Sequence, residues 1–423
     1  MKKLIAVILV LCLALSLASF ASAEETGKVY YLNFKPEADE AWQELAKTYT
    51  GLTGVEVKVL TAASGTYSQT LTSEMEKKDA APTMFQIGNA EGVVTWGSYA
   101  LPLDGTDVIN EMTTADFNLK NADGATVAIG YCYEAYGIIT NKALLEKAGY
   151  TVADIKDFES LKKVADDIHA RAAELGFDAF TSAGLDGSSS WRFSGHLTNM
   201  PLFYEFRDDG ITEQPATVKG TYLNAYKNIW DLYVTDSAAD KAKLSGFTGD
   251  AAENEFITGK AVFFQNGTWE YATLSAAMDP ASLTMLPIYC GVEGEENAAL
   301  CAGTENCWAV NAKASEADQK ATLDFMKWVV TSEEGTKMMA EQFGPIPFKS
   351  AKEPENVFFK AANDLLAEGK YVVTWAFNFT PDVDNWRAGI VSALEQYSAG
   401  TAGWDEVEYA FVNGWEKCYE NTH

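Results

Sequence analysis

The sequence predicts an α/β protein whose chain is divided between two lobes. Its 423 residues are too many for a single hydrophobic core and suit two. No linker rich in proline, glycine or serine divides the chain, which predicts lobes joined by several crossings. Strand and helix patterns alternate in the N-terminal part, and this alternation is typical of a parallel sheet flanked by helices.

The first 23 residues have the features of a signal peptide. Two lysines precede an apolar run from Leu4 to about Phe20, and residues 21–23 supply the small Ala-Ser-Ala site at which signal peptidase cleaves. The alternative is an uncleaved membrane anchor, because the run is almost long enough to span a bilayer. The cleavage site favours removal, so we expect a chain that is secreted, extracellular or associated with the cell envelope.

The mature chain is predicted to fold as β-α-β-α-β at its N-terminal end. The expected elements, in order, are a strand at 28–34, a helix at 38–49, a strand at 55–62, a helix at 67–78 and a strand at 83–88. In a parallel sheet of this kind, the loops at the carboxyl ends of the strands face the ligand. Here those loops carry polar, small or aromatic residues, among them Lys35, Glu37, Tyr67, Gln86 and Asn89.

Charge and cysteine content exclude some partners. The chain has 60 acidic against 32 basic residues, a net charge of −28, so we expect no binding to nucleic acid or to anionic lipid. Five cysteines follow the signal peptide, an odd number without metal-type spacing, which argues against a full disulfide framework. Cys290 and Cys301 flank the acidic loop GVEGEENAAL and could form one bridge.

Signatures of catalysis are scarce. The three histidines are scattered, and no zinc-protease, phosphate-loop, dinucleotide or nucleophile-elbow motif is present. We therefore expect no enzyme, no cofactor and no bound metal. The acid/base pair of a glycoside hydrolase stays open, because 60 acidic residues make some close pair of carboxylates inevitable.

Tryptophans in turns beside amides and carboxylates suggest sugar recognition. In 259-GKAVFFQNGTWEYATL-274, Trp269 follows Asn266 on the turn that leaves a strand, and Trp191 follows the run DGSSS. Trp375 and Trp386 stand at either side of the turn in YVVTWAFNFTPDVDNW. The apolar face of a pyranose stacks on an indole, and sugar hydroxyls need amides and carboxylates as partners. The alternative is that Trp269 fills the core of its own lobe.

Several segments resemble the family 1 extracellular solute-binding proteins, the maltose-binding-protein-like carbohydrate receptors of ABC importers. EAYGIITNKALLEKAGY (134–150) has the strand ending in Thr-Asn-Lys and the helix ending in Ala-Gly, and 259–274 resembles the family's GKAAM…NGSW signature. The segment 306–350 resembles the return to lobe one, with its SEEG turn and Gly-x-x-Pro end. APTMFQIG resembles PDVF, with Thr83 in place of the usual aspartate.

The resemblance implies a two-lobed fold like that of periplasmic binding proteins, with a ligand cleft and three hinge crossings. Lobe one would hold 24–136 and 304–350, and lobe two would hold 137–303 and 351–423. Gln86 and Asn89 depart from the family, which often has an aspartate in that loop. The implied ligand-binding residues are Lys35, Glu37, Tyr67, Gln86 and Asn89 from lobe one, Glu134 at the first crossing, and Trp191, Asn266, Trp269, Trp375 and Trp386 from lobe two.

The function that the resemblance implies is a monomeric receptor that captures an oligosaccharide by hinge closure and delivers it to membrane permease subunits. Two other classes stay open. The same fold could hold another small polar solute such as a polyamine, with Glu134 pairing with a cation. A secreted glycoside hydrolase would instead need two carboxylates at a fixed separation across the cleft.

Overall fold

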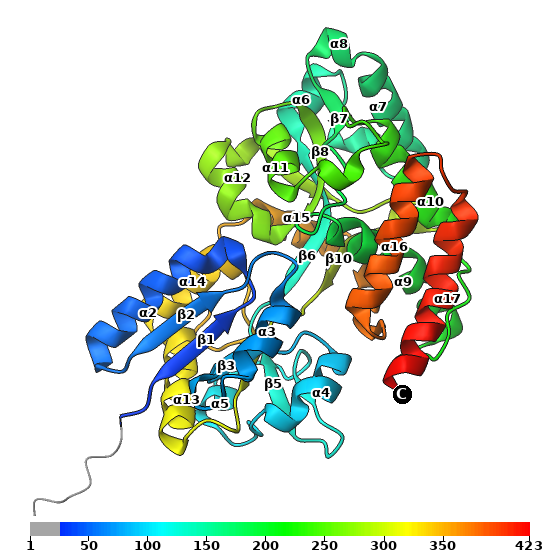
Figure 1. The fold of residues 1–423 in the computed structure, drawn as a ribbon. Coiled ribbons are helices and arrows are strands. Elements are labelled where there is room, and N and C mark those ends of the chain that lie inside the picture. The colour runs from blue at the N-terminus through cyan, green and yellow to red at the C-terminus, as the bar shows by residue number, and fades with distance from the viewer. Residues whose placement is uncertain (1–25) are drawn as a thin grey trace, which may run out of the picture.

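The computed structural model describes residues 26–423 and distributes their strands over two separate sheets, one in each lobe (Figure 1). The predicted signal peptide, 1–23, lies outside the described residues. Within 26–423, no helix combines the length and the apolar character needed to cross a membrane.

The sheet of lobe one has the order β2-β1-β3-β11-β5-β4. β1 (Val29–Asn33) pairs in parallel with β2 (Val57–Thr61) and β3 (Met84–Gln86), as the β-α-β-α-β pattern predicts. The other strands are antiparallel to their neighbours: β4 (Leu119–Lys120), β5 (Thr126–Gly130) and β11 (Cys307–Val310). The predicted helices between the parallel strands are confirmed as α2 (Asp39–Thr53) and α3 (Tyr67–Met75).

The pattern of buried residues explains why these segments form strands and helices. All five residues of β1 are buried, which fits a strand covered by helices on both faces. α2 buries one stripe, Trp42, Leu45, Ala46 and Tyr49, and ends at Gly54, whose φ of +76° few other residues adopt. The remaining helices of lobe one are α4 (Ala90–Trp96), α5 (Asp107–Asn110), α13 (Glu316–Thr331) and α14 (Glu333–Phe343).

The sheet of lobe two has the order β12-β10-β6-β8-β7, with β9 paired to β6. Its strands are β6 (Glu134–Asn141), β7 (Asp178–Phe180), β8 (Ala261–Gly267), β9 (Leu283–Leu286), β10 (Ala298–Gly303) and β12 (Tyr371–Thr374). The helices around it are α6 (Lys142–Lys147), α7 (Phe158–Ala170), α8 (Ala172–Leu175), α9 (Thr198–Asp209), α10 (Leu223–Thr235), α11 (Gly249–Ile257), α12 (Tyr271–Ala277), α15 (Val357–Ala367), α16 (Val383–Ser398) and α17 (Trp404–Thr422).

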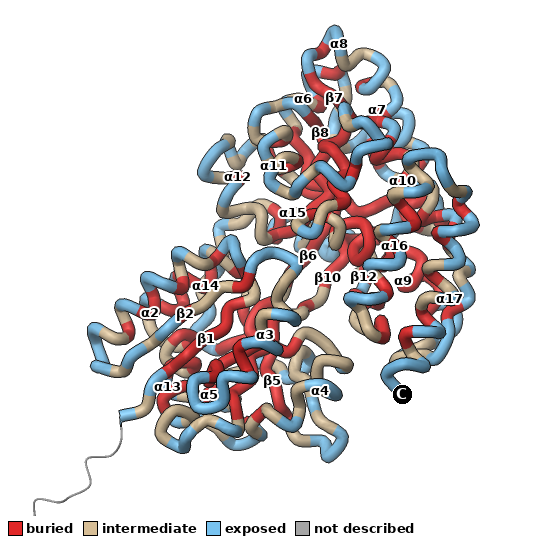
Figure 2. The backbone as a smooth tube through the Cα atoms, in the orientation of Figure 1, coloured by how far each residue is buried: buried red, intermediate tan, exposed pale blue. Residues whose placement is uncertain are grey.

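The chain changes sheet between β5 and β6, between β10 and β11, and between β11 and β12. β6 belongs to the second sheet from Glu134 onward, where it pairs with Gly303 at the end of β10. Buried residues follow the strands of both sheets and the inward faces of the helices (Figure 2). The largest apolar cluster lies in lobe two and includes residues of α7, α9, α10, α16 and α17.

The bridge considered between Cys290 and Cys301 is not formed. Both are free and buried, as are the other three cysteines among residues 26–423. The Sγ of Cys301 lies 3.6 Å from the Sδ of Met200 instead. Burial raises the pKa of the Cys290 thiol well above its usual range, which disfavours the thiolate needed for oxidation.

Candidate ligand-binding site

The two lobes approach each other through a loop and through a helix. Gly65, in the loop between β2 and α3, has a φ of +74°, and a Cβ placed on it would lie 2.5 Å from the carbonyl oxygen of Gly187 in lobe two. Elsewhere, α4 of lobe one packs against η10 (Ala376–Phe379) of lobe two. The candidate site is built from the facing parts of the two lobes.

A buried ion pair joins the end of β1 to the start of β6. The Lys35 ammonium donates to both Glu134 carboxylate oxygens, at 2.8 and 3.0 Å, and Glu37 lies 3.7 Å away. Asn306 donates to the same Glu134 carboxylate at 2.7 Å. Burial by itself lowers the pKa of Lys35, but the carboxylates of Glu134 and Glu37 outweigh it and raise the pKa above its usual value. Lys35 is therefore charged, and both oxygens of Glu134 are engaged within the protein.

Trp269 lies beside this pair and belongs to an aromatic cluster. Its ring centroid is 4.9 Å from the Lys35 ammonium, 6.0 Å from the Trp191 ring and 5.5 Å from the His196 ring. The indole lies against Gly267, where an added Cβ would be 2.2 Å from the ring, so this glycine makes room for it. Trp269 is partly buried and also packs on the core of lobe two.

His196 stands at the centre of the cluster and was not predicted as a site residue. It lies on the π-helical turn η5 (Arg192–Leu197), a distortion often found at functional sites. Its ring stacks on Tyr136 with centroids 3.8 Å apart. The Gln265 amide nitrogen donates to its Nδ1 at 2.9 Å, so Nε2 carries the proton. Burial and the charges of nearby cations hold its pKa well below the usual range, and the ring is neutral.

Three of the predicted lobe-one residues form hydrogen bonds within their own lobe. Gln86 is 3% exposed, and its amide bonds to the backbone of Phe34 and to two tyrosine hydroxyls. The Tyr67 hydroxyl accepts from the Gln86 backbone at 2.7 Å. Asn89 caps α4 by accepting from the Gly92 backbone at 2.8 Å. These contacts stabilise the lobe, and both the amide oxygen and the amide nitrogen of Gln86 are engaged in it.

The predicted lobe-two residues do not all lie at the same place. Asn266 donates to the Glu270 carboxylate at 2.6 Å and so orients the turn that carries Trp269. Trp375 is buried beside Tyr136, with ring centroids 5.6 Å apart, and its indole nitrogen has no partner among residues 26–423. Trp386 does not join the cluster. It is 2% exposed, and its indole nitrogen donates to the Phe411 carbonyl between α16 and α17.

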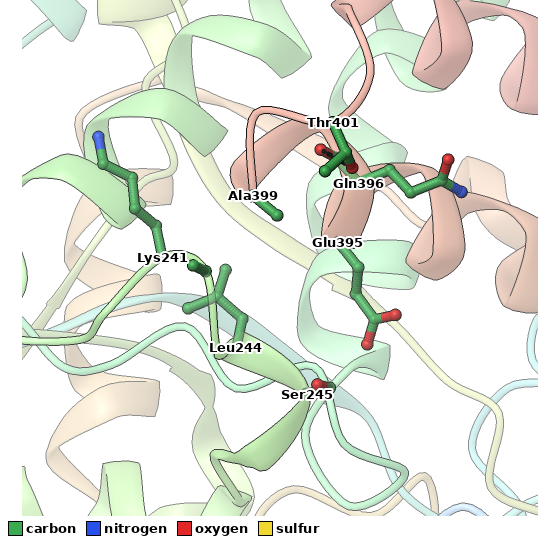
Figure 3. A pocket seen from close by; sticks show the side chains of 8 residues that line it. Lys241, Leu244, Ser245, Glu395, Gln396, Ala399 and Thr401 are labelled. Carbon is green, nitrogen blue, oxygen red and sulfur yellow. Dashed lines mark hydrogen bonds between the residues drawn. The ribbon is translucent and has the colours of Figure 1, made fainter.

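Two surface hollows lie apart from these residues. One of about 260 Å³ is formed in lobe two between Lys241–Ser245 and the end of α16 (Figure 3). The other, of about 420 Å³, is lined by residues that include Arg207, Tyr222 and Glu293. Neither contains a residue predicted to bind ligand. Within 26–423, no group of three His, Cys, Asp or Glu side chains is placed to hold a metal ion.

Residues 44–367 match the family model of the bacterial extracellular solute-binding proteins, and the chain belongs to this family. The match confirms the resemblance seen in the sequence motifs. No curated protein sequence matches the chain.

Solved structures with the same two-lobed α/β fold confirm the predicted fold class. RafE in complex with raffinose has a TM-score of 0.69 at 15% identity, covering 94% of this chain and 100% of that one. The GacH receptor of Streptomyces glaucescens, solved unliganded and with acarbose, has a TM-score of 0.67 at 18% identity, covering 94% and 100%. The sugar transporter BL01359 of Bacillus licheniformis, in complex with stachyose, has a TM-score of 0.68 at 15% identity, covering 92% and 100%.

Proposed function

We propose that the protein is the extracellular receptor of an ABC importer, which captures an oligosaccharide between its lobes and delivers it to membrane permease subunits. The observation that carries this proposal is the cluster of Trp191, His196 and Trp269 beside Lys35 of the facing lobe. An indole held in this way presents a rigid apolar surface on which a pyranose can stack. The raffinose, acarbose and stachyose bound by similar structures support the same ligand class.

The state of Glu134 favours a sugar over a polyamine. A polyamine site needs a carboxylate that is free to pair with the incoming cation. Both oxygens of Glu134 are already bonded to Lys35, and Asn306 donates to one of them. A cation at this place would meet the Lys35 ammonium and be repelled.

The receptor works without chemistry on its ligand. It acts as a monomer, binds no nucleic acid, needs no cofactor, and reaches the cell exterior after cleavage of residues 1–23. The lobes are 24–136 with 304–350, and 137–303 with 351–423. Closure about the three crossings traps the ligand and presents both lobes to the permease.

A thermal-shift screen tests the proposal. The panel contains raffinose, stachyose, acarbose and chitin oligosaccharides, with spermidine as the competing ligand class. A sugar present at a hundredfold its dissociation constant adds about 2.7 kcal/mol to the free energy of unfolding and raises the melting temperature. Chromatography of the sugar after incubation should recover it intact. Stabilisation by spermidine alone, or cleavage of the sugar, would overturn the proposal.

A further inference from the structure

Two charged side chains at the junction of the lobes, Glu305 and Arg387, form no salt bridge within the described residues, 26–423. Glu305 lies between β10 and β11, is partly buried, and has no salt bridge or hydrogen bond to its side chain among residues 26–423. Arg387, on α16, makes one hydrogen bond, from Nε to the Ser194 hydroxyl at 3.3 Å. Among the described residues, the two terminal nitrogens of its guanidinium make no hydrogen bond, and the charges of Glu305 and Asp384 act on the group.

These two residues lie in the same region as His196. The Glu305 stem rests on lobe one, where a Cβ added to Gly88 would lie 3.4 Å from the Glu305 Cβ. The Arg387 guanidinium rests on η5, with its Cζ 3.9 Å from a Cβ added to Gly195, the neighbour of His196. The charge of Arg387 acts on both Glu305 and His196. The residues on either side of Glu305 also bond at this junction: the Thr304 carbonyl accepts from Asn378 of η10, and Asn306 donates to Glu134. Glu305 therefore lies at the same junction of the lobes as Arg387 and His196.

Hydroxyl groups can form hydrogen bonds with all three side chains, Glu305, Arg387 and His196. The carboxylate only accepts hydrogen bonds, whereas the guanidinium and the Nε2 of His196 donate them. Each sugar hydroxyl donates one bond and accepts others, so neighbouring hydroxyls can serve the three groups together. A cationic ligand would be repelled by Arg387, and an anionic ligand by Glu305.

We propose that Glu305, Arg387 and the Nε2 of His196 form a polar subsite that binds hydroxyl groups of an uncharged oligosaccharide. This inference rests on the proposed function and narrows it to uncharged sugars. In the sugar complex, hydroxyls donate to the Glu305 carboxylate and the guanidinium donates to the sugar oxygens. Trp269 and Trp191 contact the apolar faces of the rings.

Binding should also release a proton near neutral pH. Burial raises the pKa of Glu305 to about 7; Arg387 and Lys35 lower it, while Glu134 and Asp384 raise it. Hydroxyls that donate to the carboxylate stabilise its charged form and lower this pKa. At pH 7 the protonated fraction therefore loses its proton when the sugar binds, and affinity rises with pH through this range.

Calorimetric titration at pH 7 in phosphate and in Tris measures both effects. The probe is whichever of raffinose, stachyose or a chitin oligosaccharide gives the largest thermal shift. Glu305→Gln should weaken its binding at least tenfold and abolish the proton release. Arg387→Gln should weaken binding by a similar factor. Glu316→Gln, which changes an exposed acid on α13, should match the wild type in both readouts.

Three outcomes would overturn the subsite. Wild-type affinity and proton release in Glu305→Gln would reject it while leaving the receptor function in place. Equal stabilisation by spermidine or digalacturonate would reject the restriction to uncharged ligands. No binding of any sugar would reject the proposed function and the subsite together. The melting temperature at pH 8 gives a readout that needs no ligand. Glu305→Gln should raise it, because the variant removes a carboxylate whose burial destabilises the charged form.

Discussion

A methyl group added at Gly65 should prevent full closure of the lobes. Gly65 has a φ of +74°, and the added Cβ of Gly65→Ala would lie 2.5 Å from the Gly187 oxygen across the junction. Non-bonded carbon and oxygen atoms rest at about 3.5 Å, so the loops must separate by about 1 Å. In lobe one alone, the only cost is that of an alanine in the left-handed region, about 1–2 kcal/mol.

The expected loss of affinity follows from that separation. A sugar bound between the lobes makes hydrogen bonds to both, and a typical one contributes about 1 kcal/mol. Loss of two such bonds costs about 2 kcal/mol, which weakens binding roughly 30-fold. Binding should remain detectable, because the tryptophans of lobe two are untouched.

Gly124→Ala is the matched control. Gly124 also lies in lobe one, has a φ of +81°, and has nothing within 4 Å of an added Cβ. The two variants should show the same lowered melting temperature without ligand, but only Gly65→Ala should bind more weakly in calorimetric titration. Solution scattering should show it less compact than the wild type when liganded. Equal affinities for the two variants would refute the idea that this contact forms on closure.

Three further predictions concern two tryptophans, the cysteines and Asp236. Trp269→Ala should weaken sugar binding at least tenfold and change the ligand-free melting temperature only slightly. Trp386→Ala should lower that temperature strongly, since truncating a buried tryptophan costs about 3–5 kcal/mol. The reverse result would mean that Trp386 binds the ligand and that Trp269 supports the core. Mature protein should show five free thiols under denaturant and none when native, and a count of three would reveal a bridge. Burial and the carboxylate of Asp166 raise the pKa of Asp236 to about 7 from an ordinary value of 3.8. The folded protein then holds a proton that the unfolded chain has lost, so the free energy of unfolding should fall from pH 4 to 7, and Asp236→Asn should flatten the fall. An unchanged slope in that variant would argue against the assignment.

The sheet of lobe one was predictable because its strands carry local signals. Val29–Asn33 and Met84–Gln86 are short, buried runs separated by amphipathic helices, and such patterns depend on neighbouring residues alone. Local pattern could not predict the pairing of β11 with β3 and β5, because this pairing joins segments about 200 residues apart. Only the resemblance of 306–350 to a segment of the family indicated that the chain returns to lobe one.

The candidate site was less predictable, because a polar residue at a strand end does not reveal where its hydrogen bonds go. Gln86 fits a ligand-facing loop by position but is bonded within lobe one. The sequence around Trp386 did indicate a core position, because Ile390, Ala393 and Leu394 follow it at helical spacing on the same buried face. His196 had no such signal, since its position depends on the π-helical turn and on the contact between its Nδ1 and Gln265.

The burial of every cysteine between residues 26 and 423 makes the protein suitable as an optical sensor. With the native thiols hidden, one cysteine introduced at the surface becomes the single point of attachment for a thiol-reactive dye. Val94 is 78% exposed on α4, the helix that packs against η10 of the other lobe. A dye at Val94→Cys would sense the approach of lobe two through its emission, so that the receptor itself reports which sugars it captures.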